Sequence, residues 1–152
     1  MRLWHKNLIP YLPRQQLIAQ WRECCAIAGN IAKKGKPNHI LVNKVLNYPP
    51  VHFLEYTRLI IGEFLLRNYI ASDKSIHNFV INFEKFGDSS ERIIIDKNTS
   101  KEFIFKDWHN KRYLLQCLAN LSEKYDCGRI PEDEWDKIKS AFPEQMKILY
   151  QE

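Results

Sequence analysis

A long amphipathic helix is the feature that most constrains the fold of this chain. Apolar residues recur at alternating steps of four and three within residues 15–34, at Leu17, Trp21, Cys24, Ala28 and Ile31. This spacing places them on one side of an α-helix. Pro13 stands before the run, and Gly35, which suits a left-handed C-terminal cap, stands after it. The sequence therefore predicts one helix over residues 15–34.

Helical spacing continues along most of the remaining chain. Further helices are expected, in chain order, over residues 38–46, 51–68, 73–86 and 108–125, and from Pro131 and Pro143 onward. The Pro49-Pro50 pair should end the first of these. Acidic residues directly after Pro131 favour a helix N-terminus there.

The segment at residues 91–106 has a different pattern. Three isoleucines at 93–95 and the pair Phe103 and Phe105 flank the turn-like residues DKNTS. This allows either a small β-hairpin or an irregular surface excursion. The expected fold is therefore mainly α, a compact single domain over residues 1–152 with room for one small β-hairpin near residues 91–106.

Composition and charge narrow the class of protein. The 152 residues are 45% hydrophobic and 27% charged, which is close to globular averages and excludes a wholly disordered chain. No apolar stretch approaches the roughly 18 residues of a membrane-spanning helix, and the start lacks the apolar core of a signal peptide. A cytoplasmic protein is expected. The net charge of +5 suits a partner that carries phosphates, although many basic proteins bind none.

The sequence contains no recognisable metal or cofactor site. Four cysteines stand at positions 24, 25, 117 and 127 without a CxxC pair. Reduced thiols are favoured over a disulfide between one of the first two and one of the last two. The five histidines show no zinc spacing, and neither a Gly-rich phosphate loop nor a GxSxG motif occurs. Any chemistry is therefore expected to need neither metal nor cofactor.

A charged pair inside the predicted helix is one candidate for a site. Rotation of about 100° per residue places Glu23 beside Gln20, and Arg22 beside Gln15. This surface is either a polar site or an ordinary solvated helix face.

The start of the chain is a second candidate. Cations alternate with aromatic rings there, at Arg2, Trp4, His5, Lys6, Tyr11 and Arg14. This alternation suits nucleic acid. Packing of Trp4 and Tyr11 onto the core is the other interpretation.

Several segments near the start together form a family pattern. The chain begins MRLWH and continues with LPRQQLIAQWRE at 12–23, Asn38-His39 before an apolar run, and LLRNY at 65–69. In these segments the chain resembles the pyrimidine-dimer DNA glycosylase family of the bacteriophage endonuclease V type. The resemblance is good over residues 1–70 and thin beyond them.

The resemblance implies an all-α monomer that acts on damaged double-stranded DNA. It makes residues 1–35 a catalytic segment and residues 36–152 a helical body. The family's nucleophile is the α-amine of the first residue, here Met1, and on the order of a tenth of such amines are neutral near pH 7. Attack on the sugar C1′ would release the base and leave a Schiff base. Glu23 would then assist proton transfers and the β-elimination that breaks the strand.

The same resemblance assigns contacts with DNA. Arg22 would hold a phosphate beside the carboxylate, and Arg2 would bind next to the amine. Gln15 matches a DNA-contacting position of the family. His39 would lie near the site and order it, and Lys124 keeps a basic position on the predicted helix over 108–125.

The chain also departs from the family. Arg2 is too bulky to permit removal of the preceding Met, so Met1 itself would be the nucleophilic residue. Gln16 stands where the family has His, while Ala26 and Asn120 stand where it has arginines. These departures leave the excised lesion open: a pyrimidine dimer is one candidate and not the only one.

Two functions of different classes therefore follow. The first is a DNA-repair glycosylase with abasic-site lyase activity. The alternative is a non-catalytic nucleic-acid-binding protein on the same helical scaffold. Borohydride trapping on abasic-site DNA discriminates between them, because only a Schiff base is reduced to a covalent adduct.

Overall fold

Helices form the regular structure of residues 1–87 and 101–151, the residues that the computed structural model describes. In chain order, with η for a 3-10 helix, they are η1 (Lys6–Tyr11), α1 (Arg14–Lys34), η2 (Asn43–Asn47), α2 (Pro50–Leu66), α3 (Asp73–Glu84), η4 (Lys101–Phe103), α4 (Lys111–Asp126), α5 (Glu132–Ala141) and α6 (Pro143–Leu149). The prediction of a mainly α fold is confirmed.

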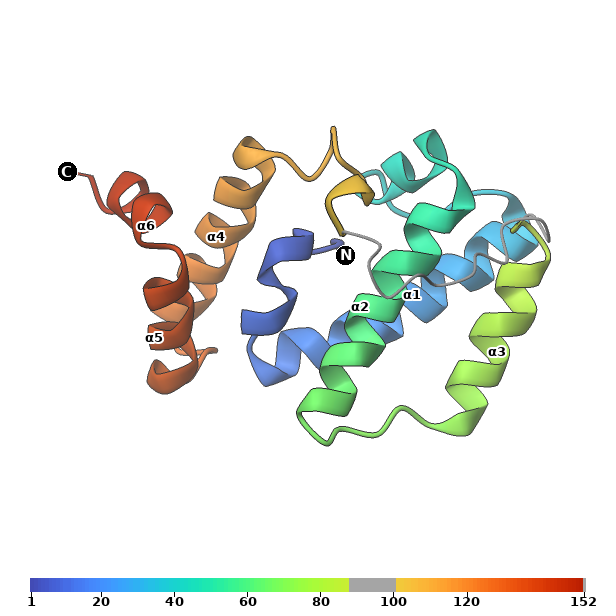
Figure 1. Ribbon diagram of the computed structural model, residues 1–152, viewed down its shortest axis with the longest axis horizontal. Coiled ribbons are helices and arrows are strands. Elements are labelled where there is room, and N and C mark those ends of the chain that lie inside the picture. The colour runs from blue at the N-terminus through green and yellow to red at the C-terminus, as the bar shows by residue number, and fades with distance from the viewer. Residues whose placement is uncertain (88–100, 152) are drawn as a thin grey trace.

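The long helix α1 forms as its apolar pattern predicts. Its predicted stripe is buried, from Leu17 at 0% exposure to Ile31 at 7%. Gly35 ends the helix with a φ of 80°, and its N–H donates to the Ile31 carbonyl at 2.8 Å. The buried side of α1 packs against α2 and α3, so three helices share this part of the core (Figure 1).

The N-terminal segment lies in the middle of the molecule. Figure 1 shows α1, α2 and α3 on one side of it and α4, α5 and α6 on the other. The 3-10 helix η1 contacts both α2 and α5. Leu3 is fully buried and Trp4 is 6% exposed. Packing of Trp4 onto the core is therefore confirmed, whereas Tyr11 stays 41% exposed.

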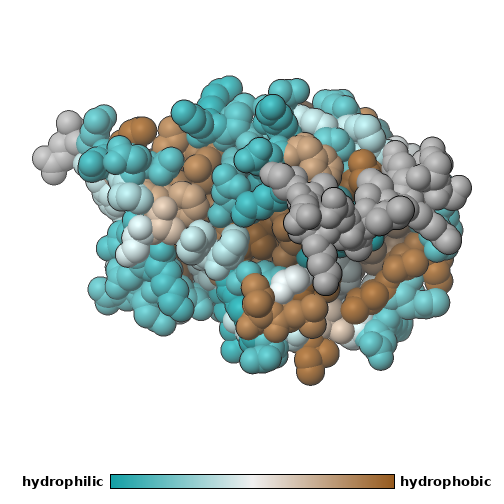
Figure 2. Space-filling model, viewed as in Figure 1, coloured by the Kyte–Doolittle hydropathy of each residue, from teal (hydrophilic) through white to brown (hydrophobic). Residues whose placement is uncertain are grey.

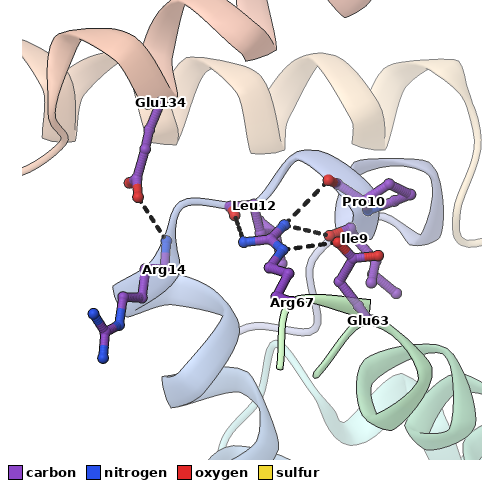
Figure 3. Close-up of polar contacts among 7 residues, drawn as sticks. All are labelled: Ile9, Pro10, Leu12, Arg14, Glu63, Arg67 and Glu134. Carbon is purple, nitrogen blue, oxygen red and sulfur yellow. Dashed lines mark hydrogen bonds and ion pairs between the residues drawn. The ribbon is translucent and has the colours of Figure 1, made fainter. Parts of the chain in front are cut away.

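One arginine fixes the turn from η1 into α1 (Figure 3). The Arg67 guanidinium donates to the carbonyl oxygens of Leu12 at 2.8 Å and Pro10 at 3.1 Å. Its Nε donates to Glu63 at 2.8 Å. On the other side of this turn, the Arg14 N–H lies 3.4 Å from the Glu134 carboxylate of α5. The entry into α1 is thus held from α2 and from α5.

The predicted helix over residues 38–46 is wrong in its type and limits. Residues 39–42 form turns, and the 3-10 helix η2 follows at Asn43–Asn47. The N–H groups of Val42 and Val45 donate to carbonyls three residues earlier. A 3-10 turn is a common form of such a short connector between α-helices.

The hairpin, one of the two structures that the sequence allows over residues 91–106, does not form at its second arm. Residues 88–100, which include the three isoleucines, lie outside the described residues. Phe103 ends η4, and Phe105 has a φ of 50° within a turn. Phe105 is fully buried among aromatic rings, including those of Trp108 and His109. Because Trp108 and His109 belong to this packed turn, α4 begins at Lys111, after the N-cap Asn110, and not at residue 108 as predicted.

Apolar side chains gather on the face shown in Figure 2, around the C-terminal end of α2 and along α3. The most exposed of them are Leu65, Leu66 and Ile70, at 72%, 80% and 91%. Within residues 1–87 and 101–151, no helix has both the length and the apolar character needed to cross a membrane.

Candidate active site

A surface pocket of about 380 Å³ brings together most of the predicted site residues. Its lining consists of Trp4, Gln15, Gln16, Ile18, Ala19, Arg22, Glu23 and Lys124. Steps of three and four residues join the α1 members of this lining, as from Gln15 to Ala19 and from Ala19 to Arg22, so they share one side of the helix. Lys124 of α4 faces them, so the pocket carries two cations and one carboxylate.

The Glu23 carboxylate lies against the first peptide bond of the chain. Its Oε2 atom lies 3.4 Å from the Arg2 N–H and accepts a 3.0 Å hydrogen bond from Gln20. The side chain is half-buried, whereas Met1 is 40% exposed. Because the Arg2 nitrogen belongs to the peptide bond with Met1, the α-amine of Met1 is only one residue from the carboxylate. Glu23 is therefore not on a merely solvated helix face.

Gln20 joins this carboxylate to the N-terminal backbone. It is fully buried, and its Nε2 donates to the Arg2 carbonyl at 2.9 Å as well as to Glu23. Its Oε1 accepts from the Trp4 N–H at 2.8 Å. The Tyr56 hydroxyl of α2 lies 3.0 Å from the same Oε1 atom.

Two tyrosines hold the next carbonyls of the segment. The Tyr56 hydroxyl donates to the Trp4 carbonyl at 2.6 Å, and the Tyr113 hydroxyl of α4 donates to the Leu3 carbonyl. Burial raises the pKa of both phenols, so each keeps its proton and remains a donor at neutral pH.

Arg2 lies beside the site and turns towards α4. Its guanidinium carbon is 5.8 Å from the Trp4 ring centre and 5.9 Å from that of Tyr113, within range of cation–π attraction. The Nη1 atom of Arg2 lies 4.0 Å from the Cys117 sulfur. The side chain is half-buried, so its charge lies at the edge of the core.

The structure does not bring His39 to the pocket. His39 lies in the turn that follows the C-terminal end of α1, and its Nδ1 accepts from the Leu41 N–H at 3.2 Å. The residues that line the pocket come from the N-terminal half of α1, from Trp4 and from α4. A role for His39 in ordering the site has no support from this geometry.

The sequence did not predict the roles of four residues that build the site. They are Trp4, Gln20, Tyr56 and Tyr113. The helical position of Gln20 beside Glu23 was the one available signal. The two tyrosines bind backbone carbonyls distant in sequence, and no local pattern marks such contacts.

The cysteines and the potential metal ligands are placed as follows. All four cysteines carry free thiols: Cys24 and Cys117 are buried, Cys25 is half-buried and Cys127 is exposed. Burial raises the pKa of Cys24, Cys25 and Cys117. Among the described residues, no three His, Cys, Asp or Glu side chains form a group that could hold a metal ion.

Comparison with known proteins assigns the chain to a family. Neither the curated proteins nor the solved structures give a match. The family model described as pyrimidine dimer DNA glycosylase matches residues 1–76, which is half of the chain and includes all the α1 residues of the pocket. The family is one of DNA-repair enzymes, and its substrate is DNA. The chain therefore belongs to the pyrimidine dimer DNA glycosylase family.

Proposed function

We propose that this protein is a DNA glycosylase with abasic-site lyase activity, whose nucleophile is the α-amine of Met1. The contact between the Glu23 carboxylate and the Arg2 N–H carries this proposal. It joins a half-buried acid to the residue next to the amine, at a pocket that Arg22 and Lys124 also line. Amine-based cleavage of a glycosidic bond needs a nucleophile and a proton-transfer group close together, and this contact supports such a pairing.

The chemistry begins at the sugar C1′. The lone pair of the neutral amine forms a C1′–N bond, while the glycosidic bond breaks and its electrons leave with the base, which takes up a proton. Opening of the sugar ring then gives a protonated Schiff base. Loss of a proton from C2′ expels the 3′-phosphate, and hydrolysis regenerates the amine. Glu23 accepts or returns the proton in these steps.

The cations of the site account for DNA binding. Arg22 is exposed at the pocket, and Lys124 faces it from α4. We propose that both contact phosphates of the damaged strand and that the exposed amide of Gln15 contacts the DNA between them. Arg2, held by two aromatic rings, keeps a positive charge beside the first residue of the chain.

Borohydride trapping tests the proposal. A duplex with one abasic site should form a covalent adduct with the native chain and none with a chain extended by a few residues before Met1. The extended chain should still bind the duplex. Binding by the native chain without any adduct would support the non-catalytic nucleic-acid-binding alternative and contradict the lyase.

A further inference from the structure

We propose that Gln20 is a positioning residue for this reaction. Its buried amide holds the first residues of the chain against the Glu23 carboxylate, so that the amine of Met1 and the acid keep one relative position. The inference rests on the proposed function and adds to it a residue that does not itself touch the DNA.

The orientation of the amide is fixed by its neighbours. Nε2 faces two acceptors, the Arg2 carbonyl at 2.9 Å and the Glu23 carboxylate at 3.0 Å. Oε1 faces the Trp4 N–H, which can only donate, at 2.8 Å. Only an amide with its nitrogen on the Glu23 side satisfies all three contacts. A single side chain thus links the acid to the backbone of residues 2 and 4.

Burial makes these contacts strong. Gln20 has no exposed surface, and a buried amide that loses a partner incurs a large desolvation cost. Gln16, one helical turn earlier on α1, provides the contrast. Its Oε1 is buried and has no hydrogen-bond partner among the described residues. Of these two glutamines on the Glu23 side of α1, only Gln20 is tied to the N-terminal segment.

A free chain end would otherwise be poorly ordered. Fixing its first residues in one conformation costs backbone entropy. Hydrogen bonds from Gln20, Tyr56 and Tyr113 offset this entropy loss when the protein folds, so the segment is ordered before DNA binds. The amine then reacts from a prepared position, and a misplacement of about 1 Å in such a site lowers rates by about 100-fold.

The test compares two variants of Gln20 with one control. Gln20→Met keeps the size of the side chain and removes every hydrogen bond. Gln20→Glu keeps an acceptor but, when ionised, loses both donors and places a like charge beside Glu23. Thr57→Val is the control, because it removes a hydrogen bond of a buried residue on α2, from Thr57 to the Leu54 carbonyl, in which the N-terminal segment takes no part.

Two measurements are made on each full-length protein. The first is hydrogen exchange of the Trp4 amide, which should be about tenfold or more faster in Gln20→Met than in Thr57→Val, because Met cannot accept from this N–H. The second is the rate of borohydride-trapped adduct formation at saturating abasic-site DNA. It should fall by about tenfold or more in both Gln20 variants, while the Kd for that DNA changes by less than about twofold.

Each outcome decides a separate statement. Trp4 exchange equal to that of the control, or an unchanged adduct rate in both Gln20 variants, would overturn the role of Gln20. Equal losses in adduct rate and DNA affinity would also overturn it, since they indicate general disruption of the site. A native chain that forms no adduct contradicts the proposed function, and the Trp4 exchange still decides whether Gln20 holds the N-terminal segment.

Discussion

The surroundings of Glu23 differ from those of other half-buried carboxylates in the molecule. Glu55 and Glu63 on α2 each form an ion pair with an arginine three or four residues later, at 2.6 Å and 2.8 Å. Glu23 instead faces the N–H groups of Arg2 and Gln20. Neutral donors thus hold the Glu23 carboxylate, whereas a guanidinium holds each of the other two.

Replacement of Glu23 by Gln should remove catalysis and leave the fold almost intact. We expect strand cleavage at an abasic site to fall by about 100-fold or more, the usual scale for a lost general acid or base. Glu55→Gln is the matched control, because it changes a half-buried carboxylate outside the pocket, and it should cleave at the native rate. Native turnover by Glu23→Gln would end the assignment of this residue.

The pocket cations should contribute to DNA affinity regardless of sequence or damage. Arg22→Ala and Lys124→Ala should each weaken binding to damaged and undamaged duplexes alike. Each should also flatten the dependence of log K on log salt concentration by about one unit of slope. Lys74→Ala, at an exposed position on α3, should leave the slope unchanged. An unchanged slope in both pocket variants would place the DNA on another surface.

At the scale of elements, α1 could be predicted from the sequence because its determinants are local. The apolar stripe, Pro13 before it and Gly35 after it need no knowledge of the rest of the chain. The same pattern places Gln15, Arg22 and Glu23 together on one surface, as the pocket does. The part of the site that lies on α1 could therefore be predicted from the spacing of its residues.

The elements that were missed depend on contacts between distant parts of the chain. The 3-10 helix η1 and the turn at residues 104–109 pack together through His5 and His109. The His5 ring bonds to the His109 carbonyl at 2.9 Å, and the Lys6 N–H donates to His109 at 3.0 Å. Over one hundred residues separate these partners, and no local pattern relates them.

The contacts that Arg67 makes with the end of η1 should contribute more to the free energy of unfolding than an ion pair within one helix. Arg67→Met removes donors to three carbonyls at the end of η1 and leaves Glu63 unpaired, so we expect a loss of about 2–4 kcal/mol in the free energy of unfolding. Among the polar contacts of residues 1–87 and 101–151, Arg58→Met removes the pairing with Glu55 three residues earlier and should cost less than about 1 kcal/mol. Urea unfolding measures both. Equal losses would contradict the role of Arg67.

At the scale of the whole molecule, the site is built from both halves of the chain. The family match ends at residue 76, yet Tyr113 holds the Leu3 carbonyl and Lys124 lines the pocket. The N-terminal segment is thus enclosed between two groups of helices (Figure 1). Residues beyond the match therefore also hold the N-terminal segment.

The buried histidine pair makes stability depend on pH. Burial lowers the pKa of His5 to about 4 and that of His109 to about 2. Both Nδ1 atoms accept backbone N–H groups, from Asn7 and Lys6 respectively, which requires them to be unprotonated. As the pH falls below 6.5, these two histidines become protonated in the unfolded chain but stay neutral in the folded chain. The free energy of unfolding should therefore fall by up to about 1.4 kcal/mol per pH unit for each histidine.

Urea unfolding at pH 7.5, 6 and 5 checks this dependence. His109→Asn keeps an acceptor for the Lys6 N–H but cannot be protonated, so its stability should fall less steeply between pH 6.5 and pH 5. The burial of His52 lowers its pKa in the same direction, and its contribution remains in this variant. The same slope in native protein and variant would show that His109 is not responsible.

The central claim is that the α-amine of Met1 forms the covalent intermediate, and the most direct measurement locates the adduct. The chain is trapped with borohydride on abasic-site DNA, digested, and sequenced by mass spectrometry. We predict that the mass of the sugar fragment is carried by the N-terminal peptide, on the nitrogen of a retained Met1. An adduct on a lysine, Lys124 of the pocket included, would contradict the account.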